Sequence, residues 1–378
     1  MRIGRTWAML LKELRHISRD PRSLGMALVL PLFLMLLFGY ALNLDLDRIP
    51  TMIYDADRTP ESRALIQNFE GSRFFDVRGV TDNYRDIENA IDRNQVLLGI
   101  AIPPDYARTL GGAGHAEVQF LADGSDSNTA SIALGYAETV VQTYGFQLRT
   151  RGQQQLAGFT PQIPVEARIR IWYNETVESK NFVVPGLIAV ILMVISSLPT
   201  ALTIAREWEM GAMEQLMSTP LRPAEMILGK MGAYFVVGAI DTIISVAVAI
   251  YVFKVPFRGD MALLAGSAAI FLCGAMCWGL LLSSIAKSQF MAFQMGMVSS
   301  FLPAFLLSGF IYLIENMPAA IQVMTRMIPA RYFVTLVRSI FQKGVGLEVL
   351  WPELAFLSGF SLIVLILSTL AMRKKMGM

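Results

Sequence analysis

Residues 206–230 read REWEMGAMEQLMSTPLRPAEMILGK, a polar stretch that separates two long apolar runs. Charged residues this close together cannot lie in hydrocarbon, so the stretch must lie outside the bilayer. Ser218-Thr219-Pro220 is expected to end a first helix, because the residue before a proline avoids helical geometry. A second helix is expected to start near Pro223, where a proline costs little. The pattern predicts a short helix, a break and a return into the membrane.

The first of these helices is expected to be amphipathic. Its apolar face would carry the stem of Arg206 together with Met210, Met213 and Met217, and an adjacent face would carry Glu207 and Glu214. A flexible methionine face next to acidic side chains is suited to a partner groove. The alternative is an ordinary solvated helix whose acidic residues point to water.

The composition indicates an integral membrane protein. Hydrophobic residues make up 54% of the chain and charged residues only 16%, against roughly 25% charged in soluble domains. The formal net charge of +2 gives no argument for nucleic acid as a partner. With only two histidines, a histidine-based catalytic site is not expected, and we expect neither a catalytic residue nor a bound metal.

Hydropathy and charge together predict six transmembrane helices with an inserted α/β domain outside the cytoplasm. Six positive charges precede the first span, and Arg373-Lys374-Lys375 follows the last, so both termini are expected in the cytoplasm. The expected segments are an interfacial helix at 1–22, spans at 24–44, 181–204, 231–253, 261–285, 290–313 and 353–372, the α/β domain at 45–180, a cytoplasmic loop at 205–230, re-entrant or interfacial external helices at 314–350, and a tail at 373–378.

The inserted segment alternates strand and helix signals. Val96–Ile102 reads as a buried strand, and Thr59-Pro60-Glu61 opens a helix with Thr as its N-cap. A half-exposed strand is expected at 165–173, where apolar and polar residues alternate. Because the segment follows a span whose N-terminus is inside, it is expected on the far side of the membrane.

A carboxylate within a span is the strongest candidate for a substrate contact. Asp241 lies midway along 231–253, where insertion scales assign a carboxylate a cost of roughly 2.5–3.5 kcal/mol, so it must face protein or water. One interpretation is that Asp241 contacts a cationic substrate or forms a gating ion pair. The alternative is that Asp241 is a buried carboxylate hydrogen-bonded to Ser, Thr or Gln. Gln294, Ser299 and Ser300 in span five are candidate partners along the same path.

The sequence contains no nucleotide-binding motif of its own. Gly229-Lys230 lacks the preceding glycines of a phosphate-binding loop, and Leu307-Ser308-Gly309 falls within span five, where glycines usually serve helix packing. Any ATP and Mg²⁺ would therefore bind to a separate chain, and no cofactor is expected on this one.

Several motifs, in their order along almost the whole chain, resemble the ABC-2 type transporter permeases of the bacterial multidrug group. The loop pattern is Glu207-x-Glu209-x-Gly211-x-x-Glu214-x-Leu216, followed by Ser218-Thr219-Pro220 and Lys230. Further similar motifs are Glu13-Leu14-Arg15, Asp20-Pro21-Arg22, Ile102-Pro103-Pro104-Asp105-Tyr106, Leu307-Ser308-Gly309-Phe310-Ile311, Glu315-Asn316-Met317-Pro318 and Ile328-Pro329-Ala330-Arg331-Tyr332-Phe333. Family members often have Thr after the loop glycine, and Ala212 stands there in this chain.

The resemblance implies a permease that dimerises, as a homodimer or a heterodimer, and docks ATP-hydrolysing ABC subunits in the cytoplasm. It implies that the loop between spans two and three is the coupling helix, with Arg206, Glu207, Glu209, Met210, Gly211, Met213, Glu214 and Leu216 at the ATPase contact. The chain would export a hydrophobic or amphiphilic compound from the bacterial inner membrane. The external domain would guide substrate or dock a periplasmic adaptor (membrane fusion protein), and membrane lipids would surround the spans. The alternative is a membrane-anchored receptor or scaffold of similar topology without an ATPase.

Overall fold

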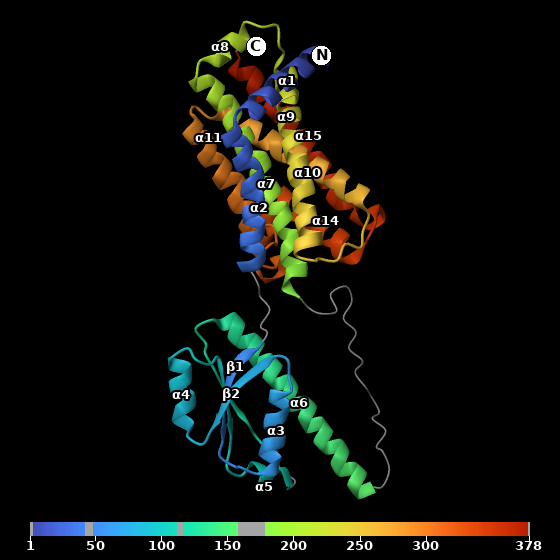
Figure 1. Ribbon diagram of the computed structural model, residues 1–378. Helices are drawn as coiled ribbons and strands as arrows, with labels where there is room; N and C mark the ends of the chain where they lie inside the picture. The colour runs from blue at the N-terminus through green and yellow to red at the C-terminus, as the bar shows by residue number, and fades with distance from the viewer. Residues whose placement is uncertain (1–2, 42–47, 112–115, 158–177, 377–378) are drawn as a thin grey trace. The chain divides into compact units, whose positions relative to one another are not determined.

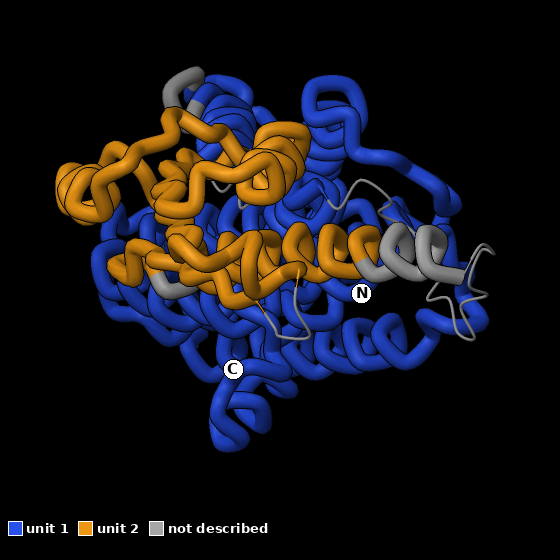
Figure 2. Tube along the Cα trace, turned by 90° about the horizontal axis from the view of Figure 1, so that it is seen from below, with its two compact units in different colours: residues 1–43, 171–378 blue, residues 44–170 orange. Residues whose placement is uncertain are grey.

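The computed structural model describes residues 3–41, 48–111, 116–157 and 178–376, and divides the chain into two compact units. The helical unit comprises Met1–Asn43 and Ile171–Met378, and the α/β unit comprises Leu44–Arg170 (Figure 2). The strand expected at 165–173 lies outside the described residues.

The α/β unit is a four-stranded sheet in the order β2-β1-β3-β4, with β4 antiparallel to the other strands. Its strands are β1 (Ile49–Asp55), β2 (Phe75–Thr81), β3 (Leu98–Ile102) and β4 (Gln119–Ala122), and its helices are α3 (Pro60–Glu70), α4 (Tyr84–Asp92), α5 (Tyr106–Gly111) and α6 (Ser127–Ala157) (Figure 1). Every residue of β3 is buried, as its continuous apolar run predicts. Thr59 caps α3 as expected: its side chain accepts the backbone N–H of Ser62.

Five helical stretches in the described residues are long and apolar enough to cross a membrane. They are α7 (Ser179–Glu209), α9 (Pro223–Ala247) with the π-helical turn Val248–Val252, α10 (Met261–Ile285), α11 (Gln289–Gly296) continuing to α12 (Leu302–Leu306), and α15 (Leu347–Lys375). The predicted first span coincides with α2 (Pro21–Ala41), whose apolar part, Ala27–Ala41, is shorter. Span five ends earlier than the predicted residue 313, because its last helical residue is Leu306 and Gly309 takes a left-handed φ of 82°.

The segment predicted as re-entrant or interfacial is packed within the helical unit. It contains α13 (Ala319–Thr325) and α14 (Pro329–Arg338), and the Phe333 ring of α14 stacks on Phe271 of α10 at 4.2 Å. Arg338 donates hydrogen bonds to the backbone carbonyls of Phe182, Gly309 and Phe310 at 3.1, 2.8 and 3.0 Å. This basic side chain therefore bonds to backbone carbonyls of the first turn of α7 and of the bend after α12, which explains a positive charge in this segment.

The N-terminal helix α1 (Ile3–Arg19) packs closely on α9 because α9 presents two glycines to it. A Cβ atom at Gly229 would collide with Met9, and one at Gly232 would collide with Leu10. The opposite face of α1 leaves Trp7 57% exposed and Ile3 88% exposed, as an interfacial helix requires. In Figure 1, α1, α8 (Ala212–Met217) and the C-terminus share one end of the helical unit.

Candidate functional site

The polar segment at this end of the helical unit is not one helix. Helix α7 runs without interruption from the apolar span to Glu209, and Met210 and Gly211 then separate it from the short helix α8. Gly211 has a φ of 70°, the left-handed conformation that commonly ends a helix and that a residue without a Cβ adopts at no steric cost. The prediction of a single amphipathic helix from Arg206 is therefore wrong.

The break also divides the predicted methionine face. Met210 is 61% exposed and Met217 is 38% exposed, whereas Met213 is fully buried in a cluster with Ile204 and Met226. Glu214 is exposed, and Leu216 is partly buried against the same cluster. The exposed residues of this segment include Glu209, Met210, Gly211, Glu214 and Met217, and Met213 anchors α8 to the helical unit.

Glu207 does not point to a partner either, because it belongs to a buried cluster of four charges. Its Oε1 lies 2.9 Å from Nζ of Lys230 at the start of α9 and 3.0 Å from Nζ of Lys12 in α1. Lys230 also contacts Glu13 Oε1 at 3.1 Å, and Glu13 Oε2 lies 3.9 Å from Lys12. The Lys230 side chain is fully buried, whereas Lys12 is half exposed.

This four-charge cluster joins three segments that are distant in sequence: α1, the end of α7 and the start of α9. A buried ammonium group needs partners, and removal of one partner from a buried pair costs about 3–5 kcal/mol. A displacement of α7 at Glu207 must therefore move α1 and α9 with it or break the cluster. The cluster is a mechanical link between the polar segment and the helices behind it.

Glu209 and Arg206 form a second link, to the start of α11. Glu209 accepts hydrogen bonds from the backbone N–H of Gln289 at 2.8 Å and from its Nε2 at 2.5 Å. Arg206 donates from Nε to Oε1 of Gln289 at 3.4 Å. Arg5 of α1 donates to the carbonyl oxygen of Pro220, beyond α8. The polar segment is thus held by α1, α9 and α11 together.

The three residues predicted along a substrate path lie in different surroundings. Asp241 is fully buried in α9, and neither carboxylate oxygen has a hydrogen-bond partner among the described residues. Gln294 is exposed on α11. The Ser299 hydroxyl accepts from Trp278 at 3.1 Å and donates to the Met295 carbonyl at 2.7 Å. The structure therefore does not pair Asp241 with Gln294, Ser299 or Ser300.

Helix periodicity places Asp241 on the side of α9 that faces α7 and α10. Asp241 follows Lys230 by about three helical turns, so both lie on the face of α9 that meets α7. Gly238, one turn before it, packs against Leu272 and Met276 of α10. On α7, Ser196 precedes Glu207 by the same number of turns, which places it at about the depth of Asp241. Its hydroxyl is also buried and has no hydrogen-bond partner in the described part of the chain.

A mostly apolar cavity of about 400 Å³ lies between the polar segment and this level. Its walls come from α1, α2, α7, α9 and α11, and Val237, one turn before Asp241, lines it. Its polar lining includes His16, Asp20 and Arg206, together with Thr203. An apolar chamber with polar groups among its walls accommodates an amphiphilic molecule.

The comparisons with known proteins agree with this geometry. A family model described as ABC-2 family transporter protein matches residues 21–370. The probable multidrug ABC transporter permease YbhS of Escherichia coli K12 is 34% identical over 373 residues, which cover 98% of this chain and 97% of the relative. The probable multidrug ABC transporter permease YbhR of the same organism is 32% identical over 350 residues, 93% of each chain. This chain belongs to the ABC-2 transporter family.

Membership of the ABC-2 family confirms the resemblance seen in the sequence motifs. The inner membrane transport permease YhhJ of Escherichia coli K12 is similar over 97% of this chain and 96% of its own length, at 24% identity. The chain is therefore a multipass membrane permease, and the relatives do not favour the alternative of a receptor or scaffold.

The four-charge cluster is the part of this ABC-2 permease that sequence reasoning missed. Glu13 and Lys230 are 217 positions apart, and Lys230 stands at the edge of an apolar run where a lysine is normally read as a membrane-interface anchor. Helical periodicity could have revealed the cluster, because it places a glutamate and a lysine on the buried faces of their helices. Glu13 follows Met9 by one turn in α1, and Lys230 follows Met226 by one turn in α9.

Proposed function

We propose that the chain is the transmembrane permease subunit of an ATP-driven exporter that moves a hydrophobic or amphiphilic, drug-like or lipid-like compound out of the cytoplasm or inner leaflet. It would sit in a bacterial inner membrane with both termini in the cytoplasm. A second permease copy and separate ABC ATPase subunits would complete the transporter. A periplasmic adaptor bound to the α/β unit would be a further partner. The observation that carries the proposal is the exposed surface of α8, which follows directly after α7, together with the charges that link the end of α7 to α1 and α9.

Force from the ATPase would enter at Met210, Gly211, Glu214 and Met217. Because Glu207 and Glu209 hold α9, α1 and α11, a push on α8 would be transmitted to several spans rather than absorbed by a loop. The interface between the two permease copies, formed by α7 and α11 of each copy, would then open alternately to the inside and to the outside of the membrane. In this scheme Arg206, Glu207, Glu209, Met213 and Leu216 transmit the force without touching the ATPase.

The apolar cavity supports an amphiphilic cargo. An apolar body would enter the chamber beside Arg206, and Asp241 would attract a cationic group deeper along α9. Gln294 and Ser299 would border the later part of the path in span five. The names of the relatives YbhS and YbhR, both probable multidrug permeases, agree with a cargo of this kind.

The test is co-purification of the ABC ATPase with this permease after a change at the exposed surface. Glu214→Lys reverses one exposed charge and leaves the buried charges intact, so we expect the permease to fold while ATPase recovery and export fall at least fivefold. Glu348→Lys is the matched control, because Glu348 is exposed at the start of α15. Unchanged recovery and export with Glu214→Lys would reject the assignment of α8.

A further inference from the structure

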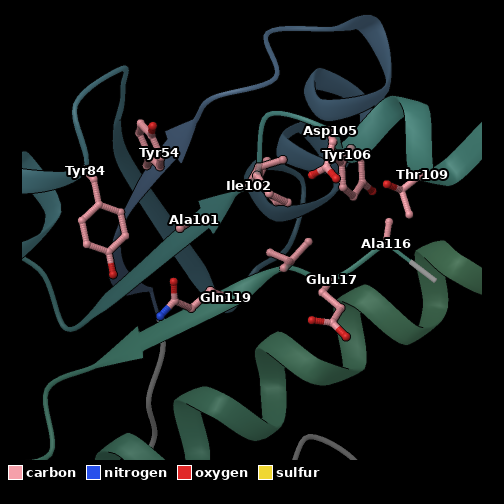
Figure 3. A pocket seen from close by; sticks show the side chains of 12 residues that line it. Tyr54, Tyr84, Ala101, Ile102, Asp105, Tyr106, Thr109, Ala116, Glu117 and Gln119 are labelled. Atoms are coloured by element: carbon pink, nitrogen blue, oxygen red, sulfur yellow. The ribbon is translucent and has the colours of Figure 1, made fainter. Parts of the chain in front are cut away.

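The α/β unit contains a cavity of about 620 Å³ that the transport scheme does not use. Figure 3 shows its lining side chains, which come from β1, β3, the start of β4, the first residue of α4 and the α5 region. The volume is within the range of roughly 300–1,000 Å³ that is typical of small-molecule sites.

The cavity lies where the topology of a parallel sheet favours a ligand. From β1 the chain passes to β2 on one side, and β3 then pairs with β1 on the other side, so the chain direction switches between β1 and β3. In open α/β sheets, ligands bind at such a switch point, beyond the carboxyl ends of the strands. Tyr54, Ala101 and Ile102 lie at these ends and line the cavity.

A small residue on the sheet surface creates the hollow. Gly99 and Ala101 point to the face that α4 covers, and Ile87 of α4 fills the space over Gly99. Helix α4 begins only at Tyr84, so it leaves room for the cavity above Ala101. Ala101 lies at the floor of the cavity between its two cross-strand neighbours, Tyr54 in β1 and Gln119 in β4.

The walls are aromatic on one side and acidic on another. The rings of Tyr54 and Tyr84 stand edge to face, 5.8 Å apart at 86°. Asp105 and Glu117 line the cavity, and no Lys, Arg or His is among its described lining residues. Asp105 is paired with Arg108 at 3.6 Å, whereas Glu117 is exposed, so its carboxylate is accessible to a ligand. Burial, with Tyr144 and Asp57, raises the pKa of Tyr106, so its phenol stays neutral in the wall.

We propose that this cavity binds an organic cation with an apolar or aromatic body. Aromatic faces attract an organic cation and also cover its apolar surface. The carboxylates and the Gln119 amide supply the remaining polar contacts, and an anion of the same shape would find no Lys, Arg or His among the described residues that line the cavity. The site belongs to the α/β unit and shares no residue with the coupling surface, so the proposal holds whether or not α8 docks an ATPase.

The experiment measures binding of radiolabelled tetraphenylphosphonium to the full chain in detergent by equilibrium dialysis, with empty micelles subtracted. Tetraphenylborate has nearly the same shape and the opposite charge, so it isolates the effect of charge. We expect saturable binding of the cation, weakened roughly three- to tenfold by Tyr84→Ala and by Glu117→Gln. Ala101→Leu would fill the floor and reduce binding further.

Glu88→Gln is the matched control, because Glu88 is exposed on α4 and is not among the residues that line the cavity. Glu117 is exposed, so its substitution leaves the fold intact even if Tyr84→Ala does not. Equal cation affinity in Glu117→Gln, Ala101→Leu and the unmodified chain would overturn the proposal, since binding would then lie elsewhere in the protein. Equal affinity for the borate would overturn the charge assignment.

Discussion

Replacement of Lys230 by methionine is the most informative test of the buried cluster. Methionine resembles the apolar stem of lysine, with sulfur in place of one methylene group, and lacks the ammonium group. Lys230 Nζ lies 2.9 Å from Glu207 and 3.1 Å from Glu13, and its side chain is fully buried. With an effective dielectric constant of about 20, each attraction is worth roughly 5 kcal/mol before desolvation is subtracted. The removal of one partner from a buried pair costs about 3–5 kcal/mol net.

The position of Lys12 determines where in the range of about 3–5 kcal/mol the loss for Lys230→Met should fall. Lys12 Nζ lies 3.0 Å from the same Glu207 oxygen and is half exposed, so Glu207 keeps a partner when Lys230 is changed. Glu13 keeps only a distant contact with Lys12, at 3.9 Å. We therefore expect Lys230→Met to lower the free energy of unfolding by about 3 kcal/mol, the lower end of the range. The added change Glu13→Leu should restore part of the loss, because Glu207, the remaining carboxylate of the cluster, would keep Lys12 as its partner.

The assay is SDS titration of the purified permease in mixed micelles, followed by far-ultraviolet circular dichroism. Lys180→Met is the control, because Lys180 and Glu178 pair at 3.0 Å with side chains 36% and 41% exposed. A surface pair of this kind contributes about 0–1 kcal/mol. A loss for Lys230→Met no larger than that for Lys180→Met would refute the reasoning from burial.

Two further changes test the packing and the substrate path. A Cβ atom at Gly279 would collide with the side chain of Thr200 and the carbonyl of Ser197, so Gly279→Ala should lower the free energy of unfolding by about 1–3 kcal/mol. Gly266 has open space around it, so the control Gly266→Ala should change the free energy of unfolding by less than about 0.5 kcal/mol. Equal effects in the same titration would contradict this packing. Asp241→Asn removes a buried charge whose oxygens have no hydrogen-bond partner among the described residues, so the free energy of unfolding should not fall. Export of a cationic dye should drop at least fivefold, whereas export of a neutral dye should stay unchanged. Equal export of both dyes at the unmodified rate would exclude Asp241 from the path.

Hydropathy was sufficient to locate most of the long apolar helices of this chain, although α2 is apolar over a shorter stretch than the predicted first span and span five ends earlier than predicted. Apolar runs of the required length fall on α7, α9, α10 and α15, because burial in lipid or protein constrains every residue of a span. The strands of the α/β unit were also predicted from the sequence, and β3 is the clearest of them because it is apolar throughout. The burial of Thr51 and Asp55 in β1, and the order of the strands in the sheet with β1 between β2 and β3, required the structure.

The candidate site was harder to predict because its properties depend on contacts between distant segments. Periodicity placed Met210 and Met213 on one helical face, but the left-handed Gly211 interrupts that helix and turns Met213 inward. The sequence alone cannot show whether Glu207 pairs with Lys230 or with a basic residue of a partner protein, because a glutamate suits either contact. Asp241 was identified from its position, whereas its surroundings in α7 and α10 follow only from helix packing.

The central claim is that α8 presents a specific surface to an ATPase while Met213 anchors it to the permease. The most direct test replaces Met210, Met213 or Met217, one at a time, by the photo-crosslinking amino acid p-benzoylphenylalanine in cells that contain the whole transporter. The account predicts crosslinks to the ATPase subunit from positions 210 and 217, and crosslinks within the permease alone from position 213. Crosslinks to the ATPase from position 213, or none from positions 210 and 217, would contradict it.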